Sequence, residues 1–281
     1  MEYQRFLTPE FTPFDPIELA EKTEKIITKE GQEGLERKYV SFYSAPVYSG
    51  IATGYAVGCC LRCIYCWTNW SRDFPEEYGK FYSPKEAADR LINEAEKGIT
   101  SRGWEHYRHL KVNKLRVSGC EPTLGKEHLL KVLEHLSNYS YQFYLETNGI
   151  LFGKDYDYVK RLAKYSDFIY VRVSFKAASP EGFTERTGAI GEHYELPFKA
   201  LKNLLDVGIY ARAAAMTDPK IMPEEERNIL IKRLDDIDPS ARYSETLEEE
   251  VIGSYDTTRK RLIAYTNREF ARELEEDFKS R

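Results

Sequence analysis

The amino-acid sequence predicts an α/β fold, a partial (β/α)6 TIM-like barrel of parallel strands with helical additions at both ends. Short β-rich runs alternate with amphipathic helical runs from about residue 51 to residue 234. The connections between successive β-rich runs are long enough to hold a helix, which parallel neighbours require. The chain has 281 residues, which is enough for one large domain or two small ones.

Five strands and five helices are predicted in this alternating region. The strands are Ile51–Val57, Lys114–Ser118, Tyr141–Glu146, Phe168–Phe175 and Gly208–Met216. The helices are Pro84–Lys97, Lys126–Ser137, Tyr156–Tyr165, Leu196–Val207 and Glu224–Leu234. Ser83 is placed to cap the first of them, with Pro84 at the first helical position. A sixth strand is predicted near Ala241–Ser244.

The barrel core is predicted to span residues 46–245, and the regions on either side of it are predicted to be helical. Residues 1–45 form an extension packed on the barrel, with an amphipathic helix at Pro16–Thr28. Residues 246–281 form a C-terminal helical segment, which we expect to close the barrel bottom or to cover the substrate. Its apolar side chains recur at near-helical spacing, at Ile263, Phe270, Leu274 and Phe278.

Composition and charge exclude several classes of protein. With 42% hydrophobic and 31% charged residues, the chain is too apolar for disorder and too charged for a membrane bundle. The net charge of -5 argues against a protein that mainly coats nucleic acid. The uncharged run Tyr39–Leu61 contains Pro46 and three glycines, which disfavours a membrane helix. We therefore expect a cytoplasmic protein with no membrane partner.

The five cysteines point to a metal centre. Cys59, Cys60, Cys63 and Cys66 lie within eight residues, and Cys120 stands alone, which is unlike a disulfide framework. Cys59, Cys63 and Cys66 form C-x3-C-x2-C, in which each thiolate can bind one iron of a 4Fe–4S cluster and leave the fourth iron open. Structural zinc, which takes four ligands, is the alternative, but there is no second C-x2-C pair.

This motif, with the aromatic Tyr65 just before the last cysteine, resembles the signature of the radical S-adenosylmethionine (SAM) superfamily. Two later segments strengthen the resemblance. Ser118–Pro122 reads Ser-Gly-Cys-Glu-Pro and is similar to the Gly-Gly-Glu-Pro element whose backbone meets the SAM amino group. Cys120 replaces the second glycine, which is acceptable where no positive φ is required. Glu146–Gly149 resembles the acidic-Thr-Asn-Gly stretch of glycyl-radical-enzyme (pyruvate formate-lyase) activating enzymes.

The resemblance implies a site at the ends of the strands. The cluster ligands would be Cys59, Cys63 and Cys66, and Glu146 would hold the SAM ammonium. Alternation along the fourth strand points Arg172, Ser174 and Lys176 to the barrel centre, where Ser174 and Lys176 match positions that bind the SAM ribose and carboxylate. The implied SAM contacts are Tyr65, Trp67, Ser118, Gly119, Cys120, Glu121, Glu146, Ser174, Lys176 and Arg212.

Some of these residues also have structural interpretations. Lys176 could extend its ammonium to water at the barrel end. Arg212 could bind a SAM carboxylate or a substrate anion, or pair with a buried acid such as Glu121 or Glu146. Asn148 and Gly149 form a common turn dipeptide, so we assign them a structural role.

The function implied by the resemblance is reductive cleavage of SAM at a single 4Fe–4S cluster. The 5′-deoxyadenosyl radical would abstract hydrogen from a protein (activase-like), a peptide or a metabolite. No side chain is assigned a catalytic role, because the cluster and SAM carry the chemistry. An electron donor such as flavodoxin or ferredoxin is the expected partner.

Two other functions stay open. One is a radical SAM modifier of a tRNA or RNA base, for which the basic stretch His106–Lys114 is a candidate contact, although we favour a solvated loop face there. The other is a non-catalytic iron–sulfur or zinc protein.

Overall fold

The computed structural model describes residues 3–279, and the strands in this range form one nine-stranded sheet. The order along the sheet is β1-β2-β3-β5-β6-β7-β8-β9, with β4 paired to β2. The strands are β1 Thr28–Gly31, β2 Gly34–Ala45, β3 Ile51–Ala56, β4 Lys80–Tyr82, β5 Lys114–Ser118, β6 Gln142–Thr147, β7 Ile169–Phe175, β8 Ala211–Met216 and β9 Glu248–Glu250.

The helices agree closely with the sequence pattern. All five predicted core helices are present, and α2 has the predicted bounds. The α-helices are α1 Pro16–Ile27, α2 Pro84–Lys97, α3 Lys126–Leu136, α4 Ile150–Lys154, α5 Tyr156–Leu162, α6 Pro180–Thr187, α7 Leu196–Asp206, α8 Glu224–Ile237, α9 Tyr243–Thr246, α10 Asp256–Thr266 and α11 Arg268–Lys279. Short 3-10 turns lie at η1 Val47–Ser49, η2 Trp70–Arg72, η3 Glu105–Tyr107, η4 Ala163–Tyr165 and η5 Gly191–Glu195.

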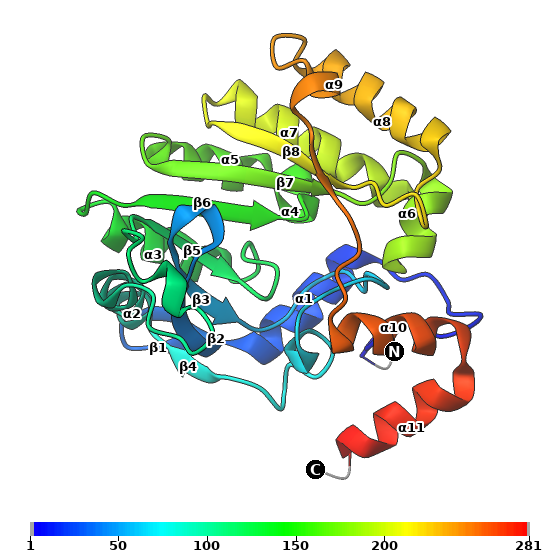
Figure 1. Ribbon diagram of the computed structural model, residues 1–281, viewed down its shortest axis with the longest axis horizontal. Helices are drawn as coiled ribbons and strands as arrows, with labels where there is room; N and C mark the ends of the chain where they lie inside the picture. Colours follow the sequence, from blue (N-terminus) through cyan, green and yellow to red (C-terminus); the bar gives the residue numbers. More distant parts are fainter. Residues whose placement is uncertain (1–2, 280–281) are drawn as a thin grey trace.

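The strands from β3 to β9 confirm the predicted partial barrel. β3, β5, β6, β7, β8 and β9 pair in parallel, and the sheet remains open. Helices α3, α5 and α7 connect successive strands and lie on one face of the sheet (Figure 1). Val171, Val173 and Phe175 face these helices and belong to the main hydrophobic core. The polar side chains between them therefore point to the inner face, as the alternation predicts.

The sixth parallel strand was predicted in the wrong place. It is β9, at Glu248–Glu250, whereas Tyr243 to Thr246 form α9. Arg242 has a φ of 46°, in the left-handed region, so the backbone there does not continue as a strand. Three consecutive glutamates are a poor strand pattern. They pair with β8 because Arg172, on β7, forms ion pairs with Glu248 and Glu250.

The N-terminal extension contains the predicted helix and an unpredicted hairpin. Helix α1 begins after Asp15, whose carboxylate accepts a hydrogen bond from the Ile17 backbone at 2.7 Å. Strands β1 and β2 then form an antiparallel pair, and β2 pairs antiparallel with β3. Part of the extension is thus an integral part of the sheet.

The C-terminal segment ends in two helices, as expected, but begins with β9 and a loop. The chain crosses from β9 to α10 in front of the sheet, and α10 lies beside the N-terminal segment (Figure 1). Phe278 packs on Trp70 and Phe74, and the partly buried Phe270 and Leu274 join the same cluster. Ile263 departs from the predicted apolar stripe because 39% of it is exposed.

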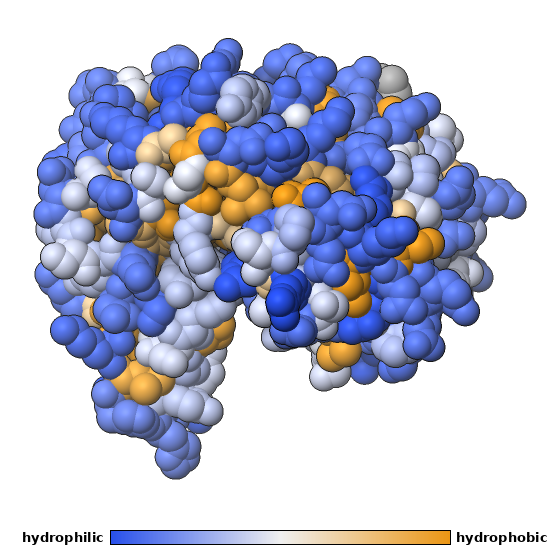
Figure 2. Space-filling model, turned by 90° about the horizontal axis from the view of Figure 1, so that it is seen from above, coloured by the Kyte–Doolittle hydropathy of each residue, from blue (hydrophilic) through white to orange (hydrophobic). Residues whose placement is uncertain are grey.

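On the face shown in Figure 2, most residues are hydrophilic, apolar residues gather in a band, and the outline is hollowed between two lobes. Among the described residues, no helix combines the length and apolar character needed to cross a membrane.

Candidate functional site

The cysteine motif lies on the loop that follows β3 at its C-terminal end. Gly58 begins this loop with a φ of 87°, and a Cβ there would come within 2.6 Å of the Thr23 side chain on α1. The loop is fixed to neighbouring segments through its backbone. Its Gly58 carbonyl accepts from the Glu121 backbone N–H at 2.9 Å, and its Arg62 N–H donates to Thr187 at 2.9 Å.

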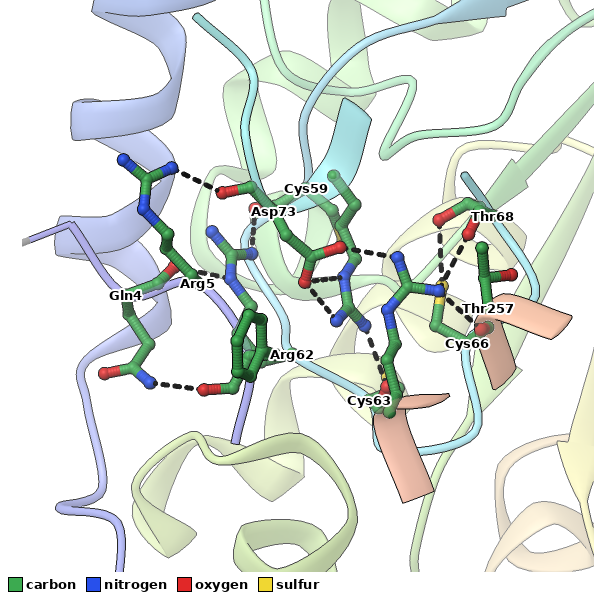
Figure 3. Close-up of polar contacts among 12 residues, drawn as sticks. Gln4, Arg5, Cys59, Arg62, Cys63, Cys66, Thr68, Asp73 and Thr257 are labelled. Atoms are coloured by element: carbon green, nitrogen blue, oxygen red, sulfur yellow. Dashed lines mark hydrogen bonds and ion pairs between the residues drawn. The ribbon is translucent and has the colours of Figure 1, made fainter. Parts of the chain in front are cut away.

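Three buried arginines hold the cysteine backbone, one for each cysteine of the motif (Figure 3). Arg62 donates to the carbonyl of Cys59 at 2.8 Å, and Arg72 donates to that of Cys63 at 2.8 Å. Arg261, from α10, donates to the carbonyl of Cys66 at 2.7 Å. Nothing in the sequence pattern marked any of these arginines as part of the site.

Electrostatics favour the thiolate form at two of the three cysteines. Burial alone would raise the pKa of Cys66, but Arg72 and Arg261 outweigh it and lower that pKa. A hydrogen bond from Cys60 lowers the pKa of Cys59 to about 7. Burial raises the pKa of Cys63 to about 11, with smaller contributions from Cys66 and Cys59 in the same direction.

The second loop, after β5, packs directly on the cysteine loop. Gly119 has a φ of 77°, and a Cβ there would lie 2.6 Å from the Tyr55 ring, so glycine is required. Cys120 is not among the described non-glycine residues with positive φ. The position of Cys120 requires no positive φ, so cysteine is compatible with the backbone where the family element has its second glycine.

Glu121 joins this second loop to the third one, after β6. Its carboxylate is 2% exposed and accepts from the Thr147 hydroxyl at 2.7 Å and from the Asn148 backbone at 2.8 Å. It also accepts from the Thr123 hydroxyl at 2.7 Å. Its oxygens are thus occupied in holding two loops together.

Arg37, on β2, fixes the shape of the second loop and was missed by the sequence analysis. It donates to the carbonyls of Pro122 at 2.6 Å, Glu121 at 2.8 Å and Leu124, and to the Cys120 sulfur at 3.3 Å. Because Arg37 lies in a region expected to be helical, nothing in the local pattern indicated this contact.

Asn148 has a wider role than the turn assigned to it. Its Oδ1 accepts from the Ile150 backbone at 3.0 Å, which is the expected turn geometry. Its Nδ2 also donates to the Cys60 sulfur at 3.3 Å and lies 3.8 Å from the Cys59 sulfur. The loops after β3, β5 and β6 therefore meet at one end of the barrel.

Glu146 points to the inner face of the sheet and is already hydrogen-bonded. It accepts from Arg116 at 2.9 Å, from the Tyr48 hydroxyl at 2.6 Å and from Ser118 at 3.5 Å. Burial, and then Glu146 itself, raise the pKa of Tyr48, so this hydroxyl stays protonated and donates. Tyr48 has a φ of 52°, which costs backbone energy that this hydrogen bond helps to offset.

The inner face of β7 carries the expected cations, and acids from β9 compensate them. Arg172 forms ion pairs at 2.7 Å with Glu248 and Glu250. Burial raises the pKa of Cys63, and the charge of Lys176, directly after β7, only partly opposes that rise. Burial also opposes the lowering of the Glu250 pKa, to which Lys176 and Arg172 contribute. Lys176 and the half-buried Ser174 alternate with Phe175 and so belong to the same face as Arg172.

Arg212 lies away from the residues considered as its partners. It bonds the Tyr210 hydroxyl at 3.0 Å and Thr246 at 3.3 Å. The pairing with Glu121 or Glu146 is wrong, since both carboxylates are held by other groups. Along β8, Arg212 lies about 13 Å before Met216, the last residue of the strand.

The two aromatic residues of the motif differ in exposure. Tyr65 is buried, and its hydroxyl has no hydrogen-bond partner within the described part of the chain. Trp67 is 42% exposed, and its ring contacts those of Tyr55 and Tyr255 at centroid distances of 6.1 and 6.0 Å.

The family model of the Radical SAM superfamily matches residues 55–232, which is more than half of the chain. This chain belongs to the Radical SAM superfamily. Membership indicates an enzyme and implies SAM and a 4Fe–4S cluster as its cofactors. No protein with a curated description matches this sequence.

Of three solved structures that are similar to this radical SAM chain, SuiB is the one whose TM-score supports a likeness in fold. SuiB of Streptococcus suis is 15% identical with a TM-score of 0.51, over 80% of this chain and 45% of SuiB. TYW1 with a bound lysine-pyruvate adduct is 14% identical with a TM-score of 0.47, over 67% of this chain and 61% of TYW1. anSMEcpe with bound AdoMet is 17% identical with a TM-score of 0.44, over 80% of this chain and 59% of anSMEcpe. The chain thus spans less than half the length of SuiB.

The cysteine loop fits the donor set of an iron–sulfur cluster. Its three thiols are half-buried, and two of them have lowered pKa values beside buried guanidinium groups. In residues 3–279, no three His, Cys, Asp or Glu side chains converge closely enough to hold a single metal ion. A cubane does not require such convergence, because each cysteine binds a different iron.

Proposed function

We propose that this radical SAM enzyme cleaves SAM at a single 4Fe–4S cluster held by Cys59, Cys63 and Cys66. When bound, these cofactors supply a 5′-deoxyadenosyl radical, which abstracts hydrogen from a protein, peptide or metabolite. A protein substrate, of the kind that activating enzymes use, is supported by the resemblance of Glu146–Gly149. A flavodoxin- or ferredoxin-like protein in the cytoplasm is the proposed electron donor.

The meeting of three loops beside the cysteines carries this proposal. The backbone of Gly119 and Cys120 lies on the second loop, next to the cysteine loop, and is proposed to meet the SAM amino group. Glu121 orders this loop from within. Lys176 and Ser174, from the inner face of β7, are proposed to bind the carboxylate and ribose. Tyr65 and Trp67 are proposed beside the adenine.

Two of the acidic and basic positions have finer proposed roles. Glu146 accepts from Arg116 and Tyr48, and its partly exposed carboxylate is proposed to hold the SAM ammonium or to order Ser118 beside it. For Arg212, near the start of β8, we propose a substrate anion rather than SAM.

Anaerobic reconstitution tests the proposal. The wild-type chain is expected to take up roughly four irons and to release 5′-deoxyadenosine with dithionite and SAM. Cys59→Ser, Cys63→Ser and Cys66→Ser should each abolish both results. Cys60→Ser and Cys120→Ser are matched controls that should retain the cluster. A full cluster that yields no 5′-deoxyadenosine would contradict the proposal.

An RNA substrate is the second candidate, and an exposed loop favours it. His106, Arg108, His109 and Lys111 are all exposed on the loop that contains η3. Salt-sensitive retention of tRNA, lost in the double variant Arg108→Ala/Lys111→Ala, would support an RNA substrate. Retention that is unchanged in this variant, or no retention, would favour a protein or metabolite.

A further inference from the structure

The three arginines beneath the cysteine loop form a set that the proposed chemistry does not yet use. Arg62, Arg72 and Arg261 each donate to the carbonyl of a different cysteine. They come from the motif itself, from η2 and from the C-terminal helix α10. All three are at most 2% exposed. We call them the arginine set.

Arg261 makes the most contacts of this set with the loop. It donates to the carbonyls of Cys66 and Thr68, both at 2.7 Å, and to that of Asn69 at 3.0 Å. From the same helix, Thr258 donates to the Cys66 carbonyl at 3.1 Å, and Thr257 donates to that of Trp67 at 3.0 Å. Helix α10 therefore fixes the end of the cysteine motif from 190 or more residues away.

Within residues 3–279, carboxylates do not balance the buried charge beneath the loop. Among the described residues, the ion pairs of the arginine set are those of Arg72 and Arg261 with Asp73. Asp73 is fully buried and lies between them. Three positive charges therefore face one negative charge. Arg62 Nη2 and Arg261 Nε are also buried with no hydrogen-bond partner in this part of the chain.

Uncompensated buried charges are costly, so a negative group beside these arginines would stabilise this part of the fold. Three cysteine thiolates carrying a cluster would supply that charge. Reduction of a cluster adds one negative charge, and nearby positive charges stabilise the reduced form. The effect is strong where water is excluded, as it is around these side chains.

We propose that the arginine set positions the cluster and raises its reduction potential, and that Arg261 makes helix α10 part of the cluster site. This inference rests on the proposed function, because it requires a cluster on the three cysteines. Arg261 acts through the Cys66–Asn69 backbone and through its charge, and is a positioning residue. Asp73 opposes the charge of the set and therefore lowers the potential.

The test measures iron per chain and the midpoint potential by a redox titration followed by EPR, without substrate. Arg261→Met removes the charge and should lower the reduction equilibrium constant at least tenfold, which is 59 mV for one electron. Asp73→Asn keeps the shape of the side chain but removes its negative charge. It should raise the reduction equilibrium constant tenfold. Arg261→Lys keeps the charge but cannot span the same acceptors. It should keep the potential within twofold and lose iron faster to a chelator.

Arg233→Met is the control, since Arg233 lies on α8, pairs with Glu195 and makes no bond to the cysteine loop among the described contacts, so it should leave the potential unchanged. Opposite shifts in Arg261→Met and Asp73→Asn support the inference, because general destabilisation would not change sign. If Arg261→Met does not fold, the upward shift in Asp73→Asn decides alone. Full iron loading with unchanged potentials would overturn the inference and leave the proposed function standing. A wild-type chain that takes no cluster would instead refute the proposed function.

Discussion

Arg37→Met is the substitution expected to damage the second loop most selectively. Arg37 is 1% exposed and donates to three backbone carbonyls of the loop, those of Glu121, Pro122 and Leu124. Methionine keeps the packing of the aliphatic part of the arginine side chain, but it lacks the guanidinium and cannot donate to any of these oxygens. The substitution therefore tests mainly the hydrogen bonds of the guanidinium.

The magnitude follows from two opposing terms. Each hydrogen bond from a charged donor contributes about 1.5–3 kcal/mol, so the loss of three costs about 4–9 kcal/mol. Removing the buried guanidinium also relieves a desolvation cost of several kcal/mol. We therefore expect a net loss of about 2–4 kcal/mol in the free energy of unfolding. This is a large part of the roughly 5–15 kcal/mol typical of a native protein.

Urea unfolding of the apo chain, followed by circular dichroism, measures this loss. Arg212→Met is the control, because Arg212 is half-buried and bonds only Tyr210 and Thr246 among the described contacts. It should cost less than about 1 kcal/mol. In the reconstituted protein, Arg37→Met should also weaken SAM binding while leaving the iron content intact. Equal stability losses in the two variants would refute the reasoning.

Three further predictions concern stability alone. Burial, and then Arg37, lower the pKa of His128 from 6.5 to about 3. Between pH 6 and pH 5, the unfolded chain therefore takes up a proton at this histidine that the folded chain does not. The free energy of unfolding should fall by about 1.2 kcal/mol over this pH range because of this group. Urea titration should not show this loss in His128→Gln. Gly149→Ala should destabilise at least about 1 kcal/mol more than Gly208→Ala on thermal unfolding, because both have positive φ but a Cβ at Gly149 meets Pro197 at 2.9 Å. Equal losses would exclude that clash. Ser83→Ala removes the capping box of α2 and should cost about 1 kcal/mol by the same assay.

Local patterns accounted for most of the fold and for the centre of the site. The strand and helix periodicities located β3, β5, β6, β7 and β8 and all five core helices, because each pattern depends on near neighbours in the chain. The short strand β4 was not predicted. The spacing of Cys59, Cys63 and Cys66 needs only one loop, so the sequence alone indicated a cluster. β9 was misplaced because its pairing depends on Arg172, about 76 residues before Glu248.

By itself, the sequence determined the parallel α/β architecture, the cysteine motif and the family that this motif resembles. The tertiary structure alone decided which charged groups support that motif. Arg37 lies 85 residues from Pro122, and Arg261 lies 195 residues from Cys66. A buried arginine forms its bonds wherever the folded chain brings carbonyl oxygens together. That meeting depends on the path of the whole chain, so no pattern along a single segment records it.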